Sequence, residues 1–257
     1  MSGPTTAPAL IRRKSRATRS DTLVIIPAFN EEASLPGVIA DLTKFAPQLD
    51  VLVVVDGATD ATAEVAYVSG ATVATLPFNL GIGGALRTGF AYARAHGYER
   101  CIQFDADGQH DAREIPHLLD ALNSGFDMVI GSRFAQGGSY DAGRTRRGAM
   151  GMLRLLMYIL AGQSFTDTSS GFRGFSRPVI EFFARSYPLD YMESVESLLL
   201  ACYANFRVGE VATTMHERTG GKPSNRRVRL IYHYVRLMIV LVASASPSGR
   251  HSTGARS

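Results

Sequence analysis

Short apolar runs recur along the chain about every 25 residues, and most are followed by a stretch whose apolar positions have helical spacing. The runs are rich in Val, Ile and Leu and are bounded by Pro, Gly or Asp, which is typical of buried strands. Strands are therefore expected at residues 22–29, 51–57, 71–77, 100–107 and 127–134. Helices are expected between them, at residues 31–45, 59–70, 85–97 and 112–123.

The alternation of strand and helix predicts an α/β domain, a three-layer sandwich in which helices cover both faces of a mostly parallel central sheet. Such sheets bind ligands beyond the carboxyl ends of their strands. Polar side chains follow the expected strands at that edge: Asn30, Glu31, Asp56, Asn79, Asp105, Asp107 and Arg133. We therefore expect one rim of the sheet to carry the functional site.

The charge distribution divides the chain into an acidic body and two basic ends. All 23 acidic residues lie between Asp21 and Glu217, whereas the charged residues of 1–20 and 218–257 are all basic. A nucleic-acid binder usually carries its basic patch on the folded domain, so we expect no nucleic-acid partner. Basic ends instead suit an anionic surface such as phospholipid headgroups.

Composition and patterning divide the chain into four segments. Residues 1–20 are expected to be a disordered basic tail, and residues 246–257 a second disordered tail, because neither has hydrophobic periodicity. Residues 21–220 are expected to form the folded domain, and residues 221–245 a basic amphipathic helix. Such a helix is typical of membrane interfaces; the alternatives are packing on the sheet and a contact in a homo-oligomer.

The sequence gives several indications of location. The apolar stretches are shorter than the roughly 20 residues that span a bilayer, and the N-terminus lacks the apolar core of a signal peptide. Cys101 and Cys202 form neither a disulfide framework nor a zinc-binding pattern. We expect a cytoplasmic protein that contacts the inner face of a membrane peripherally or through a membrane-embedded partner.

The stretch "QFDADGQHDAREIPHLL" carries three carboxylates directly after an apolar run. Asp105 and Asp107 are a candidate site for Mg²⁺ or Mn²⁺, since these ions prefer carboxylate oxygens and complete their coordination with substrate phosphates. Asp111 precedes a helix and is expected to cap it. Asp60, in "VVVDGATD", is expected to be a cap or turn residue for the same reason.

A glycine-rich stretch, "NLGIGGALRTG", precedes the third expected helix. The backbone N–H groups around Gly81, Gly83 and Gly84 are candidates for phosphate binding at a helix N-terminus, and a tight turn explains the same glycines equally well. The dinucleotide-binding pattern requires a glycine where Leu86 stands and should follow the first strand. This disfavours a dinucleotide-dependent oxidoreductase.

Taken together, "VIIPAFNEE", "VVVDGATDAT", "NLGIGGALRTG", "DADGQH", "VIGSRF", "DTSSGFRGF" and "MHERTGGKPS" closely resemble family 2 glycosyltransferases of the GT-A fold. The similarity is greatest to the branch that contains dolichyl- and polyprenyl-phosphate sugar synthases, and it covers about residues 22 to 240. It implies that the segment 21–220 is a GT-A catalytic domain using a nucleotide-diphosphate sugar, with inversion at the anomeric carbon.

The resemblance also implies roles for single residues. A first group is expected to line the base and ribose pocket of the donor: Pro27, Ala28, Asn30, Glu31 and Asp56. Asp105 is expected to face the ribose and the metal, while Asp107 binds Mg²⁺ or Mn²⁺ against the donor diphosphate. Gln109 is expected near the sugar. Arg133 and Arg218 are similar to arginines that grip phosphates, a task that suits the bidentate guanidinium.

The chain departs from the family pattern at the acceptor side. Many members carry a Glu-Asp pair that supplies a base for a hydroxyl acceptor, but "DYMESVESLLLA" has Glu193 and Glu196 without an adjacent pair. A phosphate acceptor is already anionic and needs no base, so a polyprenyl phosphate fits the missing pair. The alternatives are a hydroxyl acceptor with Glu196 or Glu193 as base, acids with no role beyond a helix surface, and a catalytically silent scaffold of the same fold.

Overall fold

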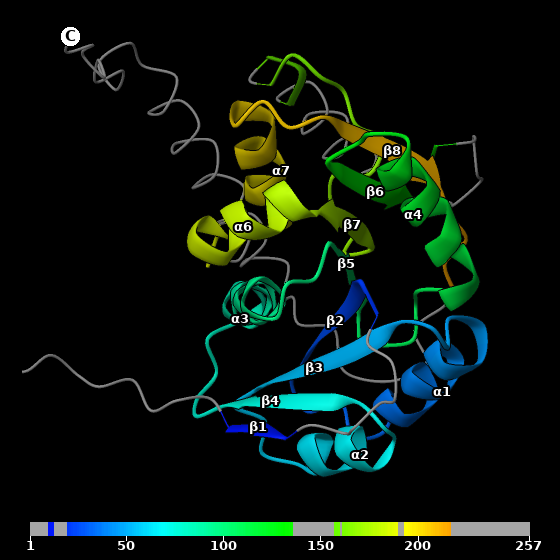
Figure 1. Ribbon diagram of the computed structural model, residues 1–257, viewed down its shortest axis with the longest axis vertical. Helices are drawn as coiled ribbons and strands as arrows, with labels where there is room; N and C mark the ends of the chain where they lie inside the picture. Colours follow the sequence, from blue (N-terminus) through cyan, green and yellow to red (C-terminus); the bar gives the residue numbers. More distant parts are fainter. Residues whose placement is uncertain (1–9, 13–19, 136–156, 160, 190–192, 217–257) are drawn as a thin grey trace, which may run out of the picture.

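A computed structural model describes residues 10–12, 20–135, 157–159, 161–189 and 193–216. One mixed sheet of eight strands runs through this part of the chain in the order β1-β4-β3-β2-β5-β7-β6-β8 (Figure 1). The strands are β1 (Leu10–Arg12), β2 (Thr22–Ala28), β3 (Asp50–Asp56), β4 (Thr72–Leu76), β5 (Arg100–Gln103), β6 (Met128–Ser132), β7 (Arg173–Ser176) and β8 (Val208–Ala212).

The strand directions confirm the predicted rim. Strands β4, β3, β2 and β5 run parallel to one another, and β6 and β8 are parallel to each other. Strand β7 is antiparallel to both β5 and β6, so it begins at the edge where they end. The carboxyl ends of the parallel strands therefore share one edge with the start of β7.

Helices cover both faces of the sheet, as predicted for a three-layer sandwich (Figure 1). The α-helices are α1 (Leu35–Phe45), α2 (Thr62–Val68), α3 (Ile82–Ala95), α4 (Ile115–Asn123), α6 (Arg177–Ser186) and α7 (Glu193–Tyr203), and a 3₁₀ turn, η1 (Ala112–Glu114), precedes α4. Helices α3, α6 and α7 share one core with the sheet, and α1, α2 and α4 share the other. None of the described helices is long and apolar enough to cross a membrane.

Strand β2 shows how the sequence divides the two cores. Leu23 and Ile25 point into the core with α3, whereas Val24 and Ile26 point into the core with α1. All four are almost completely buried. Successive side chains of a strand alternate between faces, so a continuous apolar run is what a strand buried on both faces requires.

The five expected strands and four expected helices form, with differences at their ends. Strand β5 ends at Gln103, so Asp105 and Asp107 lie in the loop after it and not on the strand. Strands β7 and β8 were not expected, because each has only four or five residues and contains a glycine or a charged residue. Helix α1 begins at Leu35, with Pro in its first turn.

The expectation of disorder across residues 1–20 is wrong for Leu10–Arg12, which forms β1 and pairs antiparallel with β4. The outer edge of β4 offers unpaired backbone groups, and a short extended segment satisfies them without any periodicity of its own. Residues 1–9 and 13–19, Arg218, the predicted helix at 221–245 and the tail at 246–257 lie outside the described residues.

Candidate functional site

The loop that follows β5 carries the two candidate metal-binding carboxylates. Gly108 has φ 76°, a left-handed conformation that turns the chain. The Gln109 N–H donates to Asp107 Oδ1 over 3.0 Å, which closes this turn. The carbonyl of Gln109 accepts the N–H of His216 over 2.8 Å, so the loop is also held by the segment that follows β8. Two separate parts of the chain thus fix the loop.

Asp105 and Asp107 lie at the edge of the interior and not in open solvent. The Asp105 side chain is 30% exposed, and Asp107 is 7% exposed. Among the described residues, no group of three or more His, Cys, Asp or Glu could hold a metal ion by itself. Two carboxylates at a rim fit Mg²⁺ or Mn²⁺, which are usually held by one or two carboxylates together with substrate phosphates.

Asp111 caps the next helical turn, as predicted. Its Oδ1 accepts the N–H of Arg113 over 2.9 Å, and its carboxylate also pairs with the Arg113 guanidinium. His216 Nε2 lies 3.2 Å from its other oxygen. The hydrogen bonds from Arg113 lower the pKa of Asp111 to about 2. Asp111 is therefore a structural anion of the loop.

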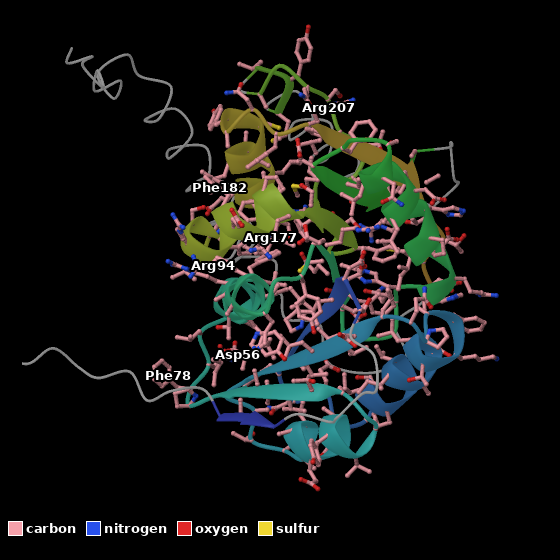
Figure 2. All side chains as sticks on the ribbon, viewed as in Figure 1. Asp56, Phe78, Arg94, Arg177, Phe182 and Arg207 are labelled. Carbon is pink, nitrogen blue, oxygen red and sulfur yellow. The ribbon has the colours of Figure 1, made fainter. Side chains whose placement is uncertain are left out.

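Asp56 lies at the end of β3, next to the loop that carries Phe78 (Figure 2). It is 3% exposed, and its Oδ1 accepts the N–H of Leu80 over 2.7 Å. Burial raises the pKa of Asp56, and backbone hydrogen bonds from Leu80 and Gly81 offset part of that rise. Besides its predicted place in the donor pocket, Asp56 anchors the glycine-rich loop to the sheet.

The structure favours the tight-turn interpretation of that glycine-rich loop. Gly81 has φ 82° and precedes α3, and its N–H donates to Asn79 Oδ1 over 3.0 Å. The N–H of Leu80 is bound by Asp56. The N–H groups of Leu80 and Gly81 are thus bound by side chains of the protein. This geometry does not support phosphate binding by Gly81, and that role stays a prediction.

The loops after β2 and β3 are joined by polar contacts at the same rim. Asn30 has φ 55°, and its Oδ1 accepts the N–H of Thr59 over 2.8 Å. The N–H of Glu31 donates to Thr62 Oγ1 over 2.9 Å, while Asp60 accepts the N–H of Thr62 in the turn directly before α2, whose N-cap is Ala61. Pro27 and Ala28 form the last two residues of β2. The residues predicted for the base and ribose pocket therefore lie along one continuous edge.

Arg133 follows β6 and is bound to Asp167, which sequence analysis did not single out. Its Nε and Nη2 donate to the two carboxylate oxygens over 2.8 and 3.1 Å. Burial works to raise the pKa of Asp167, but the hydrogen bonds from Arg133 and Ser169 outweigh it and the pKa is lowered. Arg133 is near the rim, as predicted, and Asp167 binds the edge of its guanidinium formed by Nε and Nη2. The motif "DTSSGFRGF" contained this partner, but nothing local indicated which charge it would meet.

We expect Asp167→Asn to lower the free energy of unfolding by about 3 kcal/mol, because it leaves the Arg133 guanidinium, whose side chain is 19% exposed, without its carboxylate. Urea denaturation measures the change. The matched control is Glu181→Gln, which breaks the exposed pair with Arg177 on α6 and should cost less than about 0.5 kcal/mol. Equal, small effects of both substitutions would show that the Arg133 pair does not stabilise the fold.

A second set of polar side chains, which includes Arg173 and Glu193, is buried beneath the rim. Arg173, on β7, has no exposed surface, and it donates to the carbonyls of Ser170 and Thr168 and to Ser197 Oγ. Glu193, at the start of α7, is 5% exposed and accepts a hydrogen bond from the Ser194 hydroxyl. Glu193 is therefore not an acid of the helix surface.

The pKa of Glu193 is raised above that of an ordinary surface carboxyl. Burial raises its pKa, the Ser194 hydroxyl and the Arg173 charge lower it, and the Asp105 charge raises it further. Arg173 and Asp105 both lie close enough to Glu193 for their charges to change its pKa. Glu196, one turn further along α7, is half-buried. The fold thus brings Glu193 toward the candidate metal site, while Asp190 and Arg218 lie outside the described residues.

The fold is that of a GT-A glycosyltransferase. The sequence profile described as "Glycosyl transferase family 2" matches residues 23–183. The chain belongs to this family and is a glycosyltransferase. These findings confirm the fold class, the family and the enzyme class that the motifs predicted.

Named relatives and solved structures agree with this assignment. The chain is 32% identical over 233 residues to a polyprenol monophosphomannose synthase of Mycolicibacterium smegmatis, covering 86% of each chain. It is 32% identical over 212 residues to an undecaprenyl-phosphate mannosyltransferase of Micrococcus luteus, covering 78% of this chain and 85% of the relative. A solved structure of similar fold is glucosyl-3-phosphoglycerate synthase from Mycobacterium tuberculosis, in complex with Mn²⁺, UDP and phosphoglyceric acid. It matches with a TM-score of 0.65 at 22% identity, and the match covers 93% of this chain and 81% of that structure's chain.

Proposed function

We propose that the protein is a metal-dependent, inverting glycosyltransferase that moves a hexose from a nucleotide-diphosphate sugar to a polyprenyl phosphate. The observation that carries the proposal is the 32% identity, over 86% of both chains, to a relative named for that class of product. The second relative, named for undecaprenyl phosphate and mannose, supports the same acceptor. The structural neighbour crystallised with Mn²⁺ and UDP supports a divalent ion and a nucleotide donor.

Residues at the rim are proposed to bind the metal and the donor during transfer. Asp105 and Asp107 would hold Mg²⁺ or Mn²⁺ against the donor diphosphate, and such an ion offsets the negative charge that develops on the leaving group. Asn30, Glu31 and Asp56 would position the base and ribose. Gln109 is proposed to lie near the sugar. These contacts hold the anomeric carbon open to attack from the opposite face, which gives inversion.

The acceptor phosphate does not need a general base, because a phosphate monoester is already anionic near neutral pH. Arg133 and Arg218 are proposed to bind this phosphate or the donor diphosphate. In the structure, the Arg133 guanidinium is paired with Asp167, so a phosphate bound there would share this guanidinium with the carboxylate.

A second candidate is transfer to a hydroxyl of a saccharide or secondary metabolite. One observation favours it: Glu193 is a buried carboxyl with a raised pKa whose charge interacts with Asp105. A hydroxyl acceptor requires a base, and raised carboxyl pKa values serve that role. Glu196 is the alternative base on the same helix.

We further propose that the enzyme acts at the inner face of a membrane, where a polyprenyl phosphate is held. The predicted basic amphipathic helix at 221–245 and the basic ends would bind anionic headgroups. A membrane-embedded partner would serve the same purpose, whereas packing of that helix on the sheet or in a homo-oligomer would be an alternative to membrane contact.

The proposal is tested by incubating the full chain with Mn²⁺ or Mg²⁺, labelled nucleotide sugars and a polyprenyl phosphate, and then counting label in the organic phase. Organic-soluble label that depends on the metal is the expected result. Donor consumption without organic-soluble label, but with label on an added saccharide, would overturn the lipid acceptor and favour the hydroxyl alternative. Glu193→Gln and Glu196→Gln would then identify the base.

A further inference from the structure

His110 lies directly against Asp105 and contacts it at two points. Its Nδ1 is 3.0 Å from the backbone nitrogen of Asp105, and its Nε2 is 3.4 Å from the carboxylate Oδ2. A backbone amide can only donate, so Nδ1 must be the acceptor and the ring proton must be on Nε2. Nε2 lies 3.4 Å from the Asp105 carboxylate, and this is a packing contact and not a second hydrogen bond, because the two ring nitrogens point in diverging directions. One imidazole thus binds the backbone of Asp105 and packs against its carboxylate.

The imidazole ring is held in place by aromatic side chains. It stacks on Phe172 with ring centroids 5.0 Å apart and an interplanar angle of 26°, and it meets Phe104 edge-on at 5.2 Å. The His110 side chain is 3% exposed. The ring is therefore enclosed on several sides and has little freedom to turn.

Gly171 closes the other side of the Asp105 carboxylate. A Cβ atom placed on Gly171 would lie 2.6 Å from Oδ2 and 2.8 Å from Oδ1 of Asp105. The carboxylate thus occupies the space that a side chain at position 171 would fill. The next residue, Phe172, is the one that stacks on His110. The segment before β7 therefore supplies one wall of the carboxylate site and also the support for the imidazole.

We propose that His110 and Gly171 are positioning residues that set the orientation in which Asp105 meets a divalent cation. This rests on the proposed metal-dependent function. An aspartate whose backbone N–H is bound by the imidazole, and whose carboxylate is packed between that ring and Gly171, presents its oxygens in one orientation. Outer partners of this kind typically change metal affinity 10- to 100-fold when they are altered.

Gly171→Ala tests the packing contact. The added methyl group meets the end of a side chain and not backbone, so Asp105 can rotate away and the fold should persist. We expect the affinity for Mn²⁺ alone, measured by electron paramagnetic resonance of the free ion, to fall about 10-fold or more. Gly37→Ala, on α1, is the matched control, because a Cβ there has no atom within 4 Å. Wild-type affinity in Gly171→Ala would overturn the packing role.

His110→Phe and His110→Asn test the hydrogen bond. Phe keeps a ring that can stack but has no acceptor for the Asp105 N–H, whereas Asn places an amide oxygen near the position of Nδ1. We expect Mn²⁺ affinity to fall about 10-fold or more in the Phe variant and to be partly restored in the Asn variant. Circular dichroism establishes that each variant is folded. Equal affinity of wild type and His110→Phe would overturn the role of this hydrogen bond.

Nitrogen NMR of the full-length, metal-free protein provides a readout that does not depend on activity. A neutral ring protonated on Nε2 at pH 7 is the expected result, and protonation on Nδ1 would overturn the proposal. The two proposals can fail separately. If the wild type binds Mn²⁺ and the variants bind it equally well, the positioning role fails and the metal-dependent function stands. If the wild type binds no Mn²⁺ even with UDP present, the metal-dependent function fails and the proposal that depends on it fails too.

Discussion

Asp107→Asn is expected to lower turnover by about three orders of magnitude, which corresponds to about 4 kcal/mol of transition-state stabilisation. Asn has the shape of Asp but lacks the charge that binds a divalent ion. Its Oδ1 can still accept the Gln109 N–H that closes the loop turn, so the loop should keep its conformation. The loss should therefore come from the ion and the donor diphosphate and not from misfolding.

Initial rates with saturating Mn²⁺ and donor measure this effect, and donor binding with and without Mn²⁺ identifies its cause. Asp120→Asn, an exposed position on α4, removes the same charge away from the rim and should keep wild-type activity. We expect donor binding by Asp107→Asn to become insensitive to Mn²⁺. Wild-type turnover in this variant would mean that Asp107 does not bind the metal.

Arg173→Ala is expected to lower the free energy of unfolding by about 4 kcal/mol. The guanidinium is completely buried and donates to Ser170 O over 2.8 Å, to Ser197 Oγ over 2.9 Å and to Thr168 O over 3.0 Å. Its removal leaves these acceptors without their donor and leaves a cavity. It also removes the positive charge that lowers the pKa of Glu193.

Urea denaturation followed by circular dichroism gives the size of the loss. Arg185→Ala is the control, since Arg185 is exposed in the last turn of α6 and its replacement should change stability by less than about 0.5 kcal/mol. The pKa of Glu193 should rise further in Arg173→Ala, because the neighbouring cation is gone. A loss below about 1 kcal/mol would show that water or neighbouring groups replace the guanidinium.

Asp107 and Arg173 belong to connected parts of the molecule. Arg173 holds the carbonyls of Thr168 and Ser170, and the same segment continues into Gly171 and Phe172, which contact Asp105 and His110. The loop that carries Asp105 and Asp107 is thus supported by a buried cation from a different part of the chain. Substitutions at Arg173 should weaken both the fold and the candidate site, whereas Asp107→Asn should affect the site alone.

Local patterns were sufficient where a feature depends on neighbouring residues. Continuous apolar runs predicted the strands of the parallel half-sheet, because a strand buried on both faces needs apolar residues at every position. Asp111 was predicted as a cap and Asp60 as a cap or turn residue, because such a side chain bonds to an N–H only two or three residues away. The motif order predicted the GT-A fold and the family, which the comparisons confirm.

Other features depend on which distant segments pack together, and periodicity does not record that. Arg133 meets Asp167, 34 residues away, because β7 enters antiparallel between β5 and β6. The same insertion brings Gly171 against Asp105 and buries Arg173.

The sequence by itself therefore determined the class of fold, the family and the carboxylates at the rim, because these follow from local order along the chain. Only the tertiary structure decided the partners of those residues: which charges are paired, that Glu193 is buried, and what orients Asp105. Such contacts are set by long-range packing, in which residues far apart in sequence become neighbours and exclude water from one another.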